Sequence, residues 1–369
     1  MSTELLHLTG GAMCAGRGQV VSVATCADER YVPGLLVTLG SILLFSDPAV
    51  RIDAVVLDCG IVDESWRRVA SELGKFAGRL HLQRVQVENL LPTGLPPGPQ
   101  GCLAAYARLL LPEISNSTTV VYVDSDVMFF KDVVELWRTD LCGYVAAACQ
   151  DEMIPSIAQD CVPSENVPGE APYFNSGVML IDLESWRRDD IGRKAIDFLR
   201  RHGRQCRFHD QTALNTILAG RVRLLDGCWN RTSSLRPDQF IGEPFNVHLV
   251  FAHKPWLRAS ANFFAQLWYS MYYATTGRHW HRFAATAIPR KFKYLLNSAV
   301  YNGALLSSCY GGLLSLPLGA CLGRRRVAHL REHFRQHRGY MKRVRGFAST
   351  VDARQPGRAT FKPITGRTG

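Results

Sequence analysis

The sequence predicts an α/β fold, built on a mostly parallel sheet with helices on both faces. Apolar runs of strand length alternate with helical patterns along the first half of the chain. Acidic residues follow two of these runs, and ligands of such sheets bind beyond the carboxyl ends of the strands. With 369 residues, 47% of them hydrophobic, the chain is long enough to bury a large core.

Each element rests on its own pattern of apolar residues. Short runs rich in Val, Leu and Ile predict strands, and longer runs with a helical repeat predict helices. The expected strands are Val20–Ala24, Arg51–Leu57, Leu80–Val87, Thr119–Val123 and Val145–Cys149. The expected helices are Val32–Leu44, Glu64–Phe76 and Cys102–Leu110, and the segment Leu91–Gly101, rich in Pro and Gly, predicts a loop near the rim of the sheet.

The most informative segment follows the strand Thr119–Val123, which ends at Asp124-Ser125-Asp126. Alternation along an extended chain directs Asp124 and Asp126 to the same side. Two carboxylates there suit Mn²⁺ or Mg²⁺ and leave positions open for phosphate oxygens. An Asp-rich turn after a buried strand has the same pattern, so this short motif alone leaves both interpretations open.

Further motifs stand around this one in a fixed order. They are Cys26-Ala-Asp28-Glu-Arg30-Tyr31, Ala105-Tyr106-Ala-Arg108-Leu, Tyr173-Phe-Asn175-Ser176-Gly177, Phe208-His209-Asp210-Gln211 and the segment from Val247-His248 to Lys254-Pro-Trp256. Together with the Asp124–Asp126 motif they resemble glycosyltransferase family 8 over about residues 19–258. The chain is most similar to bacterial lipopolysaccharide galactosyl- and glucosyltransferases, and more distantly similar to glycogenin and galactinol synthase.

The resemblance implies a GT-A type nucleotide-sugar-binding sheet with flanking helices and an enzyme that uses a UDP-sugar, with Mn²⁺ or Mg²⁺ as cofactor. It implies that Asp124, Asp126 and His248 bind the metal and that Lys254 contacts the diphosphate. Without the resemblance, His248 is more typical of a packed core residue and Lys254 of an exposed lysine before a turn. The family usually has a glycine where this chain has Phe251, which removes a close backbone approach to the diphosphate.

The resemblance also assigns the donor site. Asp28, Arg30 and Tyr31 stand where the family binds the nucleoside, with Arg30 replacing the usual Asn. From the residues alone, Asp28 is a helix cap. Further polar residues are implied to contact the donor or to take part in the chemistry: Ser125, Arg108, Asp151, Asn175, Ser176, Asp210 and Gln211. Alternatively, Asn175-Ser176-Gly177 forms a turn and Asp210 caps a helix.

Family members retain the anomeric configuration. Retention by double displacement requires a carboxylate close to the anomeric carbon. The matching residue here is Gln211, a poor nucleophile, beside Asp210. We therefore expect the diphosphate to leave from the face that the acceptor attacks, and a covalent adduct on Asp210 is the weaker alternative.

The charge is divided unevenly along the chain. Residues 1–256 hold 24 basic and 30 acidic residues, whereas 257–369 hold 19 and 2. A basic C-terminal part predicts an anionic partner. Aromatic residues within 263–273, basic clusters, and the segment 294–323, which has no charged residue or histidine, favour an anionic membrane surface. We expect 294–323 to lie at the interface, with a transmembrane helix as the alternative. Nucleic acid is not expected, because no known binding motif is present.

These observations divide the chain into four parts: a disordered leader (1–18), a GT-A domain (19–258), a membrane-associating segment (259–350) and a disordered tail (351–369). Eleven cysteines without paired spacing favour a reducing cytoplasm. The predicted protein is a cytoplasmic, peripheral membrane enzyme that transfers glucose or galactose from UDP to a lipopolysaccharide-core or other lipid-linked oligosaccharide. The alternatives are glycogenin-like or galactinol-synthase-like transfer to a protein or soluble acceptor, and a catalytically silent, membrane-docked sugar-binding module.

Overall fold

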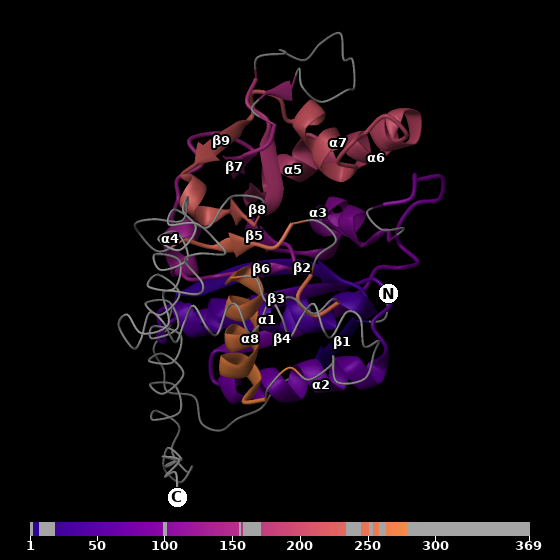
Figure 1. Ribbon diagram of the computed structural model, residues 1–369. Helices are drawn as coiled ribbons and strands as arrows, with labels where there is room; N and C mark the ends of the chain where they lie inside the picture. The colour runs from indigo at the N-terminus through magenta and orange to yellow at the C-terminus, as the bar shows by residue number, and fades with distance from the viewer. Residues whose placement is uncertain are drawn as a thin grey trace, which may run out of the picture.

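A sheet of eight strands forms the centre of the described chain (Figure 1). In this computed structural model the described residues are 3–6, 19–98, 102–154, 156–157, 171–233, 245–250, 254–257, 263–278 and 280. The strands lie in the order β1 (Thr3–Leu6), β4 (Leu80–Gln86), β3 (Arg51–Asp58), β2 (Val20–Ala27), β5 (Thr119–Val123), β8 (Phe174–Asp182), β7 (Ala146–Gln150) and β9 (Val222–Leu225). The segment expected as a disordered leader therefore contains a strand, and its other residues lie outside the described ones.

The five predicted strands are present, but β1, β8 and β9 were not predicted, and the sheet is mixed rather than mostly parallel. The pairs β4–β3, β3–β2, β2–β5 and β7–β9 are parallel, whereas β1–β4, β5–β8 and β8–β7 are antiparallel. Apolar runs mark where strands occur but carry no signal for strand direction once neighbouring strands are distant in sequence. The antiparallel β8 matters for function, because it brings Gly177 opposite the end of β5: the amide of Asp124 donates to the carbonyl of Gly177 over 2.8 Å.

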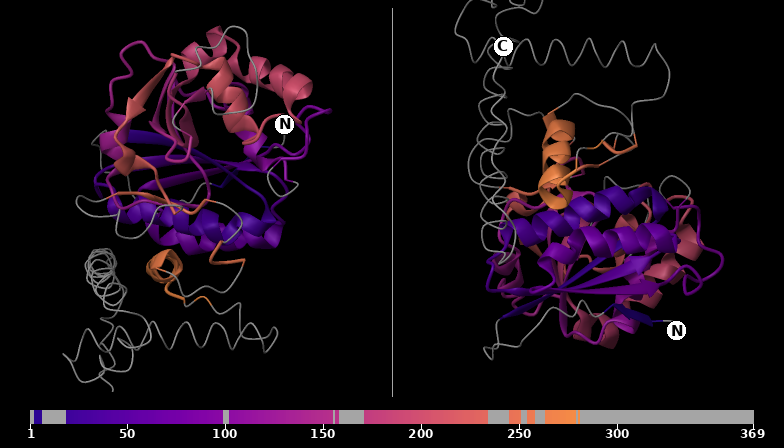
Figure 2. Two further views of the ribbon diagram at one scale, coloured as in Figure 1. Left: turned by 45° about the horizontal axis from the view of Figure 1, so that its top comes forward. Right: turned by 90° about the horizontal axis from the view of Figure 1, so that it is seen from below.

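Helices cover both faces of this sheet (Figures 1 and 2). The described α-helices are α1 (Val32–Phe45), α2 (Asp63–Leu73), α3 (Leu111–Ile114), α4 (Val133–Trp137), α5 (Leu183–Arg188), α6 (Ile191–His202), α7 (Asp210–Ile217) and α8 (Phe263–Thr276). Alternate residues of β2 belong to two separate clusters of buried side chains, Val23 to one and Ala24 to the other. Since successive strand residues point to opposite faces, each face has its own core. The predicted helix Cys102–Leu110 is a 3₁₀ helix over Ala104–Leu110.

A second, smaller sheet carries a residue of the site. It contains β10 (Arg231–Thr232), β11 (Val247–His248) and β6 (Val127–Met128), in that order. β11 runs antiparallel to β6, and His248 pairs with Val127. This register places the histidine directly beside the turn that holds Asp126.

The position of α8 corrects the expectation for residues 263–273. These aromatic side chains were assigned to a membrane surface, yet Trp268 and Tyr272 are each only 1% exposed. Figure 2 (left) shows α1 and α2 as a layer between the sheet and α8. The fit to α1 is close, because a Cβ on Gly40 would lie 2.2 Å from Thr275. Aromatic residues serve a protein core and a membrane interface equally well, so composition did not distinguish them.

The folded core therefore extends beyond the boundary expected at residue 258, through α8. The uncharged segment 294–323, the basic clusters and the tail 351–369 lie outside the described residues. Among the helices that the structure describes, none has the length and apolar character needed to cross a membrane.

Candidate active site

A cavity of about 570 Å³ opens at the carboxyl ends of the central strands. Of the fourteen residues predicted for the site, thirteen line this cavity: Asp28, Tyr31, Arg108, Asp124, Ser125, Asp126, Asp151, Asn175, Ser176, Asp210, Gln211, His248 and Lys254. The exception is Arg30, whose guanidinium binds the carboxylate of Asp28 and whose side chain is 45% exposed. Segments separated by more than 200 residues in sequence thus meet in one cavity.

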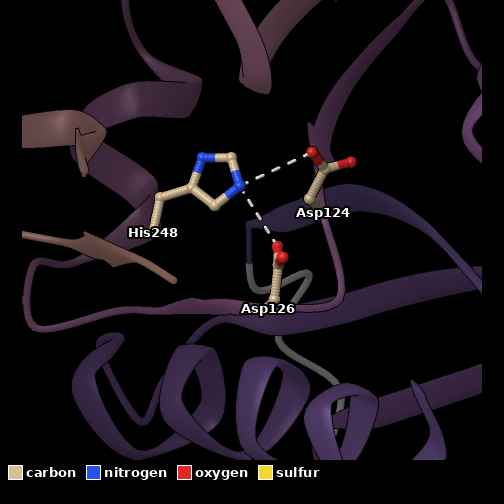
Figure 3. A group of neighbouring side chains, drawn as sticks. All are labelled: Asp124, Asp126 and His248. Carbon is tan, nitrogen blue, oxygen red and sulfur yellow. Dashed lines mark ion pairs between the residues drawn. The ribbon is translucent and has the colours of Figure 1, made fainter. Parts of the chain in front are cut away.

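Two carboxylates and an imidazole converge at one end of the cavity, which we name the metal end. Ligand atoms of Asp124, Asp126 and His248 all lie within 4.8 Å of one another (Figure 3). Nε2 of His248 is 3.2 Å from Oδ1 of Asp126 and 3.7 Å from Oδ2 of Asp124. Two carboxylates with one histidine form a set of oxygen and nitrogen ligands suited to a divalent cation.

Two glycines make room for this arrangement. A Cβ on Gly177 would lie 2.2 Å from Cε1 of His248, so the imidazole fits only above a residue without a side chain. A Cβ on Gly34 would lie 2.3 Å from the carbonyl oxygen of Ser125, which brings the first turn of α1 against the backbone between the two aspartates. The glycine of the Asn175-Ser176-Gly177 motif is therefore required by the histidine that faces it.

Basic side chains balance the carboxylates at the metal end. Nζ of Lys254 lies 2.5 Å from Oδ2 of Asp126, and Nη2 of Arg108 lies 2.9 Å from Oδ1 of Asp124. Burial favours the protonated form of Asp126, but the charge of Lys254 outweighs burial and holds its pKa well below the usual range. Oδ1 of Asp126 is buried and has no hydrogen-bond partner among the described residues. A cation would satisfy this oxygen, so the residues fit a divalent metal.

Arg108 connects two acidic residues rather than standing free in the cavity. Its Nε lies 2.8 Å from Oδ2 of Asp210, while Nη2 contacts Asp124 and Nη1 donates to the carbonyl of Ser176. Burial raises the pKa of Asp210 to about 6, although the charge of Arg108 opposes this rise. Tyr122 adds a second support to Asp124, because its hydroxyl donates to Oδ1 over 2.9 Å.

A network of amides occupies the other end of the cavity, which we name the sugar end. Oδ2 of Asp151 accepts from Nδ2 of Asn175 over 3.0 Å and from Nε2 of Gln211 over 3.1 Å. Oε1 of Gln211 accepts from the backbone amide of Ser176 over 3.0 Å. Both groups of the Gln211 amide are thus engaged, which fixes its orientation. Polar groups held in this way can discriminate between sugar hydroxyls.

The segment that follows β2 contributes the third part of the cavity. Asp28 caps the short 3₁₀ helix Glu29–Tyr31, accepting from the amide of Tyr31 over 3.2 Å, and its carboxylate also lines the cavity. The cap that the residues alone indicated is therefore present. The Tyr31 ring stands edge-on to Trp256 at 5.6 Å, and the indole of Trp256 donates to the carbonyl of Arg30. Phe251 lies outside the described residues.

Several site residues were missed by the sequence analysis. Met153, Arg207, Phe208 and His209 also line the cavity, and Asn230 contacts His248 from behind. His209 has a φ of 53°, in the left-handed region, directly before Asp210. Strained backbone of this kind is frequent at functional sites. His209 could have been predicted from its place in the His209-Asp210-Gln211 motif. Asn230 lies in none of the motifs described above.

Comparison with known proteins identifies the family. The profile of "Glycosyl transferase family 8" matches residues 22–260, which is more than half of the chain. The chain belongs to glycosyltransferase family 8. The resemblance inferred from the sequence is thereby confirmed, and the protein is a glycosyltransferase. The matched segment ends before α8, so the helix that completes the α1 side of the core lies outside it.

Relatives of this glycosyltransferase have varied names. General stress protein A of Bacillus subtilis is 27% identical over 65% of this chain and 88% of its own length. The lipopolysaccharide 1,2-glucosyltransferase of Escherichia coli is 25% identical over 64% of this chain and 73% of its own. The crystal structure of the galactosyltransferase LgtC with donor and acceptor sugar analogues has a TM-score of 0.60 and 24% identity, covering 74% of this chain and 100% of LgtC. The α/β, GT-A-like fold expected from the sequence is confirmed.

Proposed function

We propose that this glycosyltransferase moves a hexose, glucose or galactose, from a UDP-sugar to an oligosaccharide acceptor with the help of Mn²⁺ or Mg²⁺. The observation that carries the proposal is one cavity that joins a metal end, formed by Asp124, Asp126 and His248, to a sugar end of oriented amides. A nucleotide sugar has a diphosphate next to a polyhydroxylated ring. The two ends of the cavity offer groups that match these two parts.

At the metal end, Asp124, Asp126 and His248 would hold the cation. When bound, the cation would neutralise the charge that develops on the leaving diphosphate. Lys254 lies beside Asp126, and we assign its ammonium to a phosphate oxygen as well. Asp28 and Tyr31 line the same cavity, and we assign them to the uracil base, with Ser125 and Ser176 at the phosphates and sugar.

The arrangement at the sugar end favours front-face departure of the diphosphate. In this step the bond from the anomeric carbon to the phosphate oxygen breaks, the acceptor oxygen bonds to that carbon from the same face, and the acceptor proton passes to the leaving phosphate. Gln211 is a poor nucleophile and both groups of its amide are engaged. Asp210 is the carboxylate of the weaker alternative, a covalent adduct. It is held against Arg108, and a pKa of about 6 leaves it partly protonated near neutral pH.

The acceptor is proposed to be a lipopolysaccharide-core or other lipid-linked oligosaccharide. Relatives named as lipopolysaccharide glucosyl- and galactosyltransferases support this class of acceptor. The basic character of residues 257–369 supports a cytoplasmic enzyme that binds the inner face of the membrane peripherally. The correction at α8 narrows the proposed membrane segment to residues beyond 280.

A donor screen tests the proposal. We expect the full chain with Mn²⁺ to hydrolyse or transfer from UDP-glucose or UDP-galactose, and not from GDP- or CMP-sugars. Chelation should abolish the reaction, and Asp126→Asn should behave like the chelated protein. Asp53→Asn is the matched control, because Asp53 is paired with Arg51 on β3, outside the residues that line the cavity. Binding of UDP-sugar without turnover would instead indicate a silent sugar-binding module.

A further inference from the structure

Asn230 connects the two ends of the cavity from behind. It follows the short 3₁₀ helix Gly227–Trp229 and is only 2% exposed. Its Nδ2 donates to Oδ1 of Asn175 over 2.8 Å, and its Oδ1 lies 3.0 Å from Nδ1 of His248. A chain of hydrogen bonds thus leads from Asp151 through Asn175 and Asn230 to His248.

The groups around Asn175 determine which atoms donate and which accept along this series of hydrogen bonds. The backbone amide of Gly177 can only donate, and it lies 3.0 Å from Oδ1 of Asn175. On its other side, Nδ2 of Asn175 faces Asp151, a carboxylate that also accepts from the backbone amides of Met153 and Ile154. One fixed donor and one fixed acceptor therefore leave a single orientation for the Asn175 amide.

That orientation decides the proton on His248. Because Oδ1 of Asn175 is an acceptor, Asn230 must present its NH₂ group to it and its carbonyl oxygen to the histidine. Nδ1 of His248 then carries the hydrogen. A neutral imidazole has one N–H, so the lone pair is on Nε2, the atom that faces Asp124 and Asp126 (Figure 3).

We propose that Asn230 is a positioning residue that keeps His248 in the Nδ1–H tautomer and so presents Nε2 to a divalent cation. The proposal rests on the metal-dependent function proposed above and names a residue that acts on it without touching donor or metal. Hydrogen-bond partners behind a metal-binding histidine fix its ring and commonly change metal affinity 10- to 100-fold when removed, which sets the size of effect to expect. The same amide also links the ring to Asn175 and Asp151 of the sugar end.

Two substitutions separate the two contacts of Asn230. Asn230→Asp keeps an oxygen that accepts from Nδ1 of His248 but loses the donor to Asn175. Asn230→Leu has a similar volume and loses both contacts. We expect Asn230→Asp to keep Mn²⁺ affinity within about threefold of wild type, and Asn230→Leu to weaken it about 10- to 100-fold. In Asn230→Asp, UDP affinity should persist, while the extra affinity for UDP-glucose or UDP-galactose over UDP should fall.

The tautomer is measured directly by imidazole ¹⁵N NMR of the full-length, metal-free protein. The signal of His248 is assigned by its absence in His248→Gln. Wild type and Asn230→Asp should show Nδ1–H, and Asn230→Leu should lose that preference. An Nε2–H signal in wild type would overturn the proposal, even if both variants fail to fold. Equal losses of Mn²⁺ affinity in the Asp and Leu variants would also overturn it.

Calorimetric Mn²⁺ titration distinguishes a failure of this proposal from a failure of the proposed function. Wild type that shows the Nδ1–H tautomer but binds no Mn²⁺ would contradict the metal-dependent function and support the tautomer assignment. Wild type that binds Mn²⁺ with His248 in the Nε2–H tautomer would support the function and overturn the role of Asn230.

Discussion

The two ends of the cavity are held by different kinds of group. At the metal end, side chains hold side chains: Asp124 rests on Arg108 and Tyr122, and Asp126 rests on Lys254. At the sugar end, uncharged amides hold the side chains: Asp151 accepts from the side-chain amides of Asn175 and Gln211, and Gln211 accepts from the backbone amide of Ser176. The first arrangement depends on the balance of charges, and the second depends on hydrogen bonds from amides.

This difference has a consequence for binding. Charges at the metal end must rearrange when a cation arrives, because Lys254 and Arg108 already neutralise the carboxylates. Groups at the sugar end keep their orientation, so less ordering free energy opposes binding there. We therefore expect substitutions at the metal end to act mainly on metal affinity and leaving-group departure. Substitutions at the sugar end should act on sugar orientation and leave UDP binding intact.

The largest effect is expected from removing a carboxylate at the metal end. Asp124→Ala or Asp126→Ala should lower the transfer rate at least about a thousandfold, or about 4 kcal/mol of barrier, because a ligand of the cation is lost. Steady-state rates and Mn²⁺ titration measure this effect, with Asp53→Ala as control. Near-normal turnover that remained equally sensitive to chelation would exclude these residues as ligands.

Asp151→Asn tests whether a substitution at the sugar end leaves the binding of UDP and metal intact. An amide cannot accept all the hydrogen bonds that the Asp151 carboxylate accepts from Asn175, Gln211 and the backbone. We expect kcat to fall about a hundredfold, or about 3 kcal/mol, with UDP and Mn²⁺ affinities unchanged. If the Mn²⁺ affinity of Asp151→Asn fell about as much as its kcat, the metal end and the sugar end would not act independently.

Sequence motifs located these residues but not the way in which they are held. Several motif residues, among them Asp28, Asp124 and Asp151, lie at strand ends, where composition and order are informative. Thirteen of the predicted residues line the cavity. Asn230 was missed because its role arises from contacts with the distant Asn175 and His248. Tyr122 was missed although it supports Asp124, only two residues later in the sequence. The assignment of 263–273 failed for a related reason: burial of Trp268 and Tyr272 depends on the small residues of α1, such as Gly40.

Asp210 lies between the two ends and should make stability depend on pH. Burial raises its pKa to about 6 in the folded protein, above the value near 3.9 of an unfolded chain. Protonation therefore favours folding, and this contribution is lost as pH rises from about 4 through 6. From pH 5 to pH 7, the melting temperature of wild type should fall relative to Asp210→Asn, by the equivalent of about 1–2 kcal/mol. A constant difference between the two proteins would contradict the raised pKa.

A smaller effect is expected from the second support of Asp124. Tyr122→Phe removes only the hydroxyl that donates to Oδ1, so Mn²⁺ affinity should fall about tenfold while the fold persists. Cys26→Ala is the matched control, because its thiol contacts the same hydroxyl from the other side and leaves the bond to Asp124 in place. Equal losses in both variants, accompanied by a lower melting temperature, would indicate general damage to the core.

The smallest effect on donor chemistry is expected from removing the residues after 280, which belong to neither end of the cavity. A protein ending after residue 280 keeps α8 and should hydrolyse donor within about threefold of the full chain. One ending after residue 258 loses α8, exposes the face of α1 that α8 covers, and should unfold at markedly lower temperature.

The same pair of proteins tests the proposed membrane attachment. Seventeen of the nineteen basic residues after residue 256 lie beyond residue 280, so a protein ending there should no longer float with anionic vesicles. Attraction of basic groups to an anionic surface is worth about 1 kcal/mol each and is screened by salt, so the full chain should release partly at high ionic strength. Retention in high salt and alkaline carbonate would favour insertion over surface binding. Continued flotation of the shortened protein would place the attachment within the folded domain.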